Sequence, residues 1–88
     1  MESLDIMYDE SEECPIRYVG FIGARSHFDL AIVTTNHFYG KKIVISTQTG
    51  RMAILTAQEA EDVVYLASSF AVSDTEAAEL SEFLYANL

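Results

Sequence analysis

The sequence is short of cysteine, proline and basic residues, and each shortage excludes a class of protein. Among 88 residues there are one cysteine, one proline and five lysines or arginines, against 14 acids. A single cysteine, Cys14, excludes an intramolecular disulfide and every zinc site built on two or four thiolates. The acids would repel the phosphates of a nucleic acid, so we expect no nucleic acid partner.

Long apolar runs are also missing. No run exceeds five residues, far below the ~20 that a membrane-spanning helix needs. Residues 1–10 are acidic and lack the basic and apolar parts of a secretory signal. We therefore expect a cytoplasmic protein that is not membrane-associated, in which the lone thiol stays reduced. The sequence assigns Cys14 no role beyond that of a small, half-buried apolar residue.

Hydrophobic residues, in contrast, are plentiful. They make up 50% of the chain, so a folded protein is favoured over a disordered one despite the net charge of −9. The length predicts a single domain over residues 1–88. A chain of this size stays close to the lower limit for a stable core.

The charges are segregated along the chain. Residues 1–13 carry six acids and no base, and residues 57–88 carry seven acids and no base. Residues 14–56 carry one acid and all five bases, which are Arg17, Arg25, Lys41, Lys42 and Arg51. The simplest interpretation is that the acidic flanks pack near a basic sheet, and the alternative is a basic face that meets an acidic partner.

Strand patterns fill the middle of the chain. Runs of β-branched and aromatic residues predict strands at 16–23, 27–35, 41–48 and 51–55, and weak alternation suggests a fifth, edge strand at 4–9. Short loops ending in glycine favour an antiparallel meander. Gly20 lies inside a predicted strand, which suggests a bulge or a neighbour pressed against the backbone.

Two capping boxes mark helix starts near the C-terminus. Thr56–Glu59 predicts a short helix over about 57–62, and Ser73–Glu76 predicts a longer one over about 74–87. Residues 64–72 are apolar without a clear period and are interpreted as a packed connector. The predicted fold is α+β, a four- to five-stranded antiparallel meander with one short and one longer C-terminal helix packed on one face.

The two central strands are apolar on both faces, which is unusual for a sheet with one face in water. Two short helices cover only one face of such a sheet. The other face must then meet the N-terminal segment, the 64–72 connector or another chain. We therefore expect a homo-oligomer, most simply a dimer.

The stretch "NHFYGKK", residues 36–42, combines aromatic and basic side chains in a predicted hairpin loop. It leads to the hypothesis of a non-enzymatic protein–protein interaction or regulatory module without catalytic residues. The contact surface predicted for an unknown protein partner is Phe38, Tyr39, Lys41, Lys42 and Arg51.

The alternative hypothesis is a small ligand-binding protein or enzyme with a cleft formed by His27, Asp29 and Arg25. Asp29 is the only acid among the central strands, so an arginine of a neighbouring strand is expected to pair with it. His27 and His37 bracket one strand, roughly 30 Å apart. They cannot share a metal within one chain, so we expect no metal and no cofactor.

The motifs "FDLAIV", "FYGKK" and "QTGR-AI" lie within residues 25–55. This run resembles a family of small acidic proteins, a domain of unknown function found in Bacillus- and Staphylococcus-like Gram-positive bacteria. The resemblance implies an intracellular α+β protein of one domain. It implies no catalytic residue.

Overall fold

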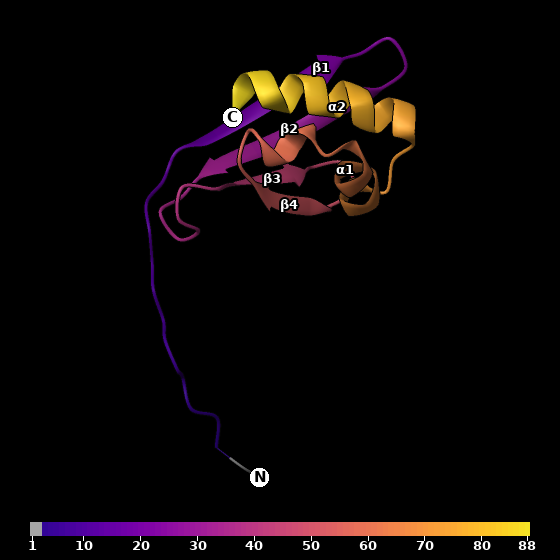
Figure 1. The fold of residues 1–88 in the computed structure, drawn as a ribbon. Helices are drawn as coiled ribbons and strands as arrows, with labels where there is room; N and C mark the ends of the chain where they lie inside the picture. The colour runs from indigo at the N-terminus through magenta and orange to yellow at the C-terminus, as the bar shows by residue number, and fades with distance from the viewer. Residues whose placement is uncertain (1–2) are drawn as a thin grey trace.

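The computed structural model describes residues 3–88, and its centre is a four-stranded antiparallel sheet. The strands are β1 (Ile16–Ile22), β2 (His27–Thr34), β3 (Lys42–Ser46) and β4 (Met52–Leu55). Their order in the sheet is their order in the chain, β1-β2-β3-β4 (Figure 1). The predicted meander is therefore confirmed, with four strands.

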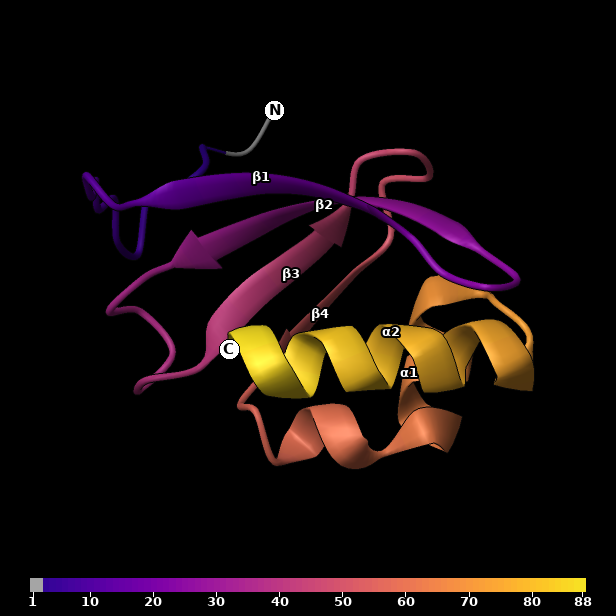
Figure 2. The same ribbon diagram turned by 90° about the horizontal axis from the view of Figure 1, so that it is seen from above.

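Three helical segments follow the sheet: the 3-10 turn η1 (Glu59–Glu61), α1 (Val63–Phe70) and α2 (Asp74–Asn87). Seen from above, α1 and α2 lie together on one side of the sheet (Figure 2). The predicted α+β class, with helices on one face, is confirmed. The long helix has the predicted bounds, whereas the short predicted helix of residues 57–62 is reduced to the single turn η1.

Both capping boxes form. At the start of α2, the N–H of Glu76 donates to Ser73 Oγ (3.2 Å), and the N–H of Ser73 donates to Glu76 Oε1 (3.1 Å). The equivalent bonds between Thr56 and Glu59 measure 3.2 and 2.9 Å. A box satisfies the free N–H groups of a first turn, but it does not set how far the helix continues.

The interpretation of residues 64–72 as a connector is wrong, because most of this stretch belongs to α1. Asp62 caps the helix by accepting a hydrogen bond from the N–H of Tyr65 (3.0 Å). Leu66 and Phe70, four residues apart, are both buried and so lie on one side of the helix. The helix ends at Ala71, whose φ of 53° lies in the left-handed region.

The predicted edge strand at 4–9 is also wrong. Residues 3–15 form no helix or strand and extend away from the sheet as an N-terminal arm (Figure 1). The radius of gyration is 15.1 Å, against about 12 Å for a compact chain of this length. A strand needs a neighbour, and the arm leaves past the ends of β2 and β3 instead of beside an edge.

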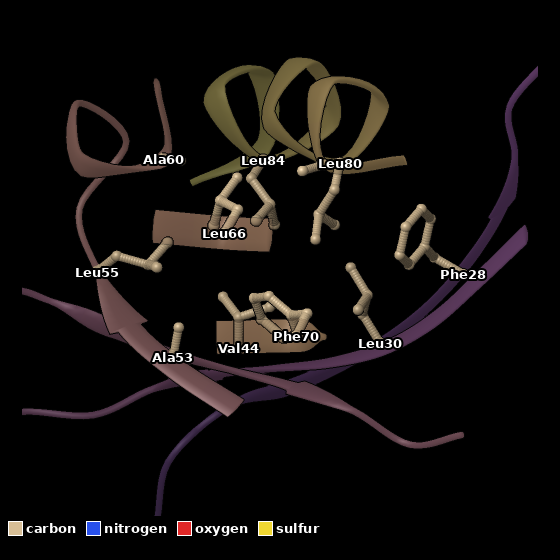
Figure 3. Close-up of a cluster of buried hydrophobic side chains, with 11 residues drawn as sticks. Phe28, Leu30, Val44, Ala53, Leu55, Ala60, Leu66, Phe70, Leu80 and Leu84 are labelled. Atoms are coloured by element: carbon tan, nitrogen blue, oxygen red, sulfur yellow. The ribbon is translucent and has the colours of Figure 1, made fainter. Parts of the chain in front are cut away.

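The core lies between the sheet and the helices (Figure 3). The sheet contributes alternate residues, and α1 and α2 contribute leucines and phenylalanine at helical spacing. The buried cluster consists of Phe28, Leu30, Val44, Ala53, Leu55, Ala60, Leu66, Phe70, Ala77, Leu80 and Leu84.

Candidate interaction face

The side of the sheet turned away from the helices carries a second set of apolar side chains. Because successive strand residues point to opposite faces, the residues between the buried ones share this side. The strand register brings them opposite one another, as in the pairs Tyr18–Ala31 and Ile45–Met52. We call this set the open face: Ile16, Tyr18, Ile22, Ala31, Val33, Ile43, Ile45, Met52 and Ile54.

The open face is exposed mainly along its two outer strands, and Ala31 at its centre is buried. Tyr18 and Ile22 in β1 are 77% and 84% exposed, and Met52 in β4 is 44% exposed. A strand spacing of about 4.8 Å and a rise of about 3.3 Å per residue give the face a footprint of roughly 400 Å². The largest apolar patch of a typical monomer is of about this size and is often functional, so the open face is a candidate interaction site.

One end of the open face is polar. His27 Nε2 lies 3.5 Å from Asp29 Oδ2. Gly20 is the cross-strand neighbour of Asp29, and a Cβ on Gly20 would lie 3.0 Å from Asp29 Oδ1. The close neighbour suggested by the glycine in β1 is therefore the Asp29 carboxylate.

The expected ion pair between Asp29 and an arginine does not form, since within residues 3–88 the only ionisable side chain paired with Asp29 is that of His27. Arg17 instead donates to the carbonyl oxygen of Asn87 at the end of α2 (3.3 Å). There it faces the negative end of the helix dipole, where a cation is stabilising. Asp29 and Arg17 point to opposite faces of the sheet, which explains why they do not pair.

The structure does not bring His27, Asp29 and Arg25 together in a cleft. Arg25 lies in the β1–β2 loop, where its backbone N–H donates to Glu79 Oε1 of α2 (2.8 Å). It lines an open groove of about 590 Å³ beside α2, and neither His27 nor Asp29 takes part in that groove. The loop approaches α2 so closely that a Cβ on Gly23 would overlap the Glu79 carboxylate.

The loop residues predicted as a contact surface are divided between the two ends of the sheet. Phe38, Tyr39 and Lys41 lie in the β2–β3 loop, where Tyr39 is fully exposed. Lys42 begins β3 opposite Leu55. Arg51 precedes β4 at the other end, because consecutive loops of a meander lie at opposite ends.

Lys41 Nζ lies 3.1 Å from Glu59 Oε2. This contact supports the interpretation that an acidic flank packs near the basic strands. It is the only Lys or Arg ion pair with an acid within the described range. Both side chains are more than 40% exposed, so the pair contributes little to stability.

The pKa of the Glu59 carboxyl lies below its ordinary value, first because the backbone N–H of Thr56 donates to it and second because of Lys41. A carboxyl whose pKa is lower in the folded state stabilises the fold at pH values above its ordinary pKa. This contribution is lost as the pH falls through the folded-state pKa.

We expect Lys41→Met to raise the pKa of Glu59 only part of the way back to its ordinary value, since the Thr56 hydrogen bond remains. Carboxyl titration by NMR measures this shift, with Lys42→Met as the matched control. A full return to the ordinary value in Lys41→Met would contradict the assignment of the backbone bond as the larger cause.

The root of the N-terminal arm is held against the β2–β3 loop. The hydroxyl of Thr35 donates to Glu12 Oε1 (2.6 Å), and the N–H of Asn36 approaches the same carboxylate at 3.3 Å. Glu10 lies 3.7 Å from His37 Nδ1. Between the arm and the sheet lies a groove of about 530 Å³, lined by Tyr8, Glu10, Ser11, Glu12, Cys14, Val33, Thr35, His37, Phe38 and Ile43.

The groove reaches the open face through Val33 and Ile43, and the half-buried Cys14 lies on its wall.

The sequence indicated that one sheet face would stay apolar and uncovered, but the contact residues predicted from it lie in the loops. The signal for the open face was the alternate set in the outer strands, at positions 16, 18 and 22 and at positions 52 and 54.

No cluster of three or more His, Cys, Asp or Glu side chains within residues 3–88 is placed to hold a metal ion. Over the same range, no helix has both the length and the apolar character needed to cross a bilayer.

Comparison with known proteins gives one family. A family model described as SAV0927-like matches residues 7–86, which is nearly the whole chain. A search of the curated proteins finds no match.

Proposed function

We propose that this chain, which belongs to the SAV0927-like family, is a non-enzymatic protein–protein interaction module that works as a homodimer. The observation that supports the proposal is the open face, an apolar sheet surface on the side opposite the helices. Contact with a second protein surface would remove this apolar area from water, and that burial lowers the free energy.

A second copy is the simplest partner for such a surface. Two equal faces related by a twofold axis form a closed interface, whereas other arrangements of one apolar patch leave part of it in water. Sheets pack face to face in many proteins, with their side chains interdigitated. The loop residues Phe38, Tyr39, Lys41 and Lys42 lie at the edge of this arrangement, and with the distant Arg51 they remain our proposed contacts for a further protein partner.

We place this module in the cytoplasm of a Gram-positive bacterium. The proposal is supported by the resemblance of residues 25–55 and by the single, reducible cysteine.

Sedimentation equilibrium of the unmodified protein over the micromolar range tests the proposal. We expect the average mass to rise with concentration from the 9.8 kDa of one chain to twice that value. A mass that remains that of one chain at the highest concentration would contradict the dimer. Dimer dissociation that does not increase with salt would agree with an apolar interface, because salt would weaken an interface held by ionic contacts.

A further inference from the structure

We infer that the N-terminal arm exchanges between the two copies, so that residues 4–8 of one chain cover part of the open face of the other. The inference rests on the proposed homodimer and names the segment that completes it. It assigns a partner to the arm and to the open face, each of which holds several exposed large apolar side chains.

The residue pattern of the arm is typical of a β-strand, although the arm pairs with no strand of the described sheet. Leu4, Ile6 and Tyr8 alternate with Asp5, Met7 and Asp9, so an extended arm presents one apolar side and one side with two acids and a methionine. Leu4 is 96% exposed, Ile6 78% and Tyr8 72%. These side chains bury little of their surface within residues 3–88 of one copy, although their pattern suits an apolar surface.

The geometry of the arm directs it away from its own sheet. Glu12 binds Thr35 and Asn36, and Glu10 lies against His37, which fixes the arm root at the β2–β3 end. From there the chain continues outward, away from the strands (Figure 1), and the longest dimension of the molecule is 52 Å. An arm anchored in this way is presented to another molecule.

The dimensions of the arm and the face match. Five extended residues span about 17 Å, and four strands are about 19 Å wide. The face alone, at roughly 400 Å² per copy, is about half of the ~800 Å² per partner typical of a stable interface. The apolar side chains of the arm supply much of the missing area, and under twofold symmetry each arm covers the face of the other copy.

Disulfide trapping between two different chains tests the exchange. Both chains carry Cys14→Ser, so the only thiols are the introduced ones. One chain carries Ile6→Cys in the arm, and the other carries Tyr18→Cys or Met52→Cys on the open face. A chain carrying Tyr85→Cys, an exposed residue of α2 on the helix side of the molecule, is the matched control. Mass spectrometry identifies the mixed dimer after oxidation.

We expect the mixed dimer to form at least ten times faster with a cysteine on the open face than with one at position 85. Equal rates for the three positions would overturn the arm exchange. A single chain carrying both Ile6→Cys and Tyr18→Cys tests whether the arm covers its own face. A disulfide within one chain that forms equally fast at every dilution would show that it does, and would also overturn the exchange. In either case sedimentation of the unmodified protein separately decides whether the dimer exists.

Discussion

Replacing Leu66 with alanine is expected to lower the free energy of unfolding by about 2 to 5 kcal/mol. Leu66 is a residue of α1 and is fully buried in the core that α1 forms with α2 and the sheet. Its removal leaves a cavity among neighbours that relax only in part. For a chain of this size the loss corresponds to a fall in melting temperature of roughly 10 °C or more.

Val64→Ala is the matched control, because Val64 lies in the same helix and is 77% exposed. It should change stability by less than about 1 kcal/mol. Thermal unfolding followed by circular dichroism measures both variants, at one fixed protein concentration because a dimer is stabilised by mass action. Equal losses for Leu66→Ala and Val64→Ala would mean that α1 does not form the described core.

The central strands were predictable from sequence because local chemistry decides them. Gly40 and Gly50 both have positive φ values, 87° and 79°, and these are the loop positions that the sequence favours for glycine. The capping box of Ser73 and Glu76 fixed the start of α2 for the same reason. Each of these signals lies within a few residues of the feature that it determines.

Helix α1 and the arm were mispredicted because distant contacts decide them. The stretch from Val63 to Phe70 includes two serines and two adjacent valines, so its helix propensity is modest. Packing of Leu66 and Phe70 against α2 and β4 decides the outcome, and only the Asp62 cap signalled it locally. The alternation of residues 4–9 suits a strand, but no strand formed by residues 3–88 pairs with it.

Candidate contact residues were harder to predict than the fold. The aromatic and basic residues around Phe38 are conspicuous in the sequence, whereas the open face is built from ordinary residues such as Ile16, Ile43 and Ile54. Those residues form one surface only when the strand register is known. The surroundings of Asp29 also depend on the strand register. The register places Gly20 of β1 opposite Asp29 of β2, which leaves room for the carboxylate.

The double variant Tyr18→Glu/Met52→Glu is expected to abolish the dimer while leaving the fold intact. Both side chains are exposed in one copy, 77% and 44%, so in an isolated chain the new carboxylates remain in water and disturb little. In a face-to-face dimer they would enter an apolar interface without partners, and burying an unpaired charge costs several kcal/mol. That cost corresponds to a dissociation constant at least about 100-fold higher.

Sedimentation equilibrium measures the loss, and circular dichroism confirms the fold. The matched control is Tyr65→Glu/Tyr85→Glu, which adds the same two charges at exposed tyrosines of α1 and α2, on the side of the sheet opposite the open face. Because the net charge changes equally, general repulsion between two acidic copies would weaken both variants alike. A control variant that dissociates as readily as Tyr18→Glu/Met52→Glu would therefore reject the open face as the dimer interface, whereas a dimer retained only in the control places the interface on the side of the sheet that the helices leave uncovered.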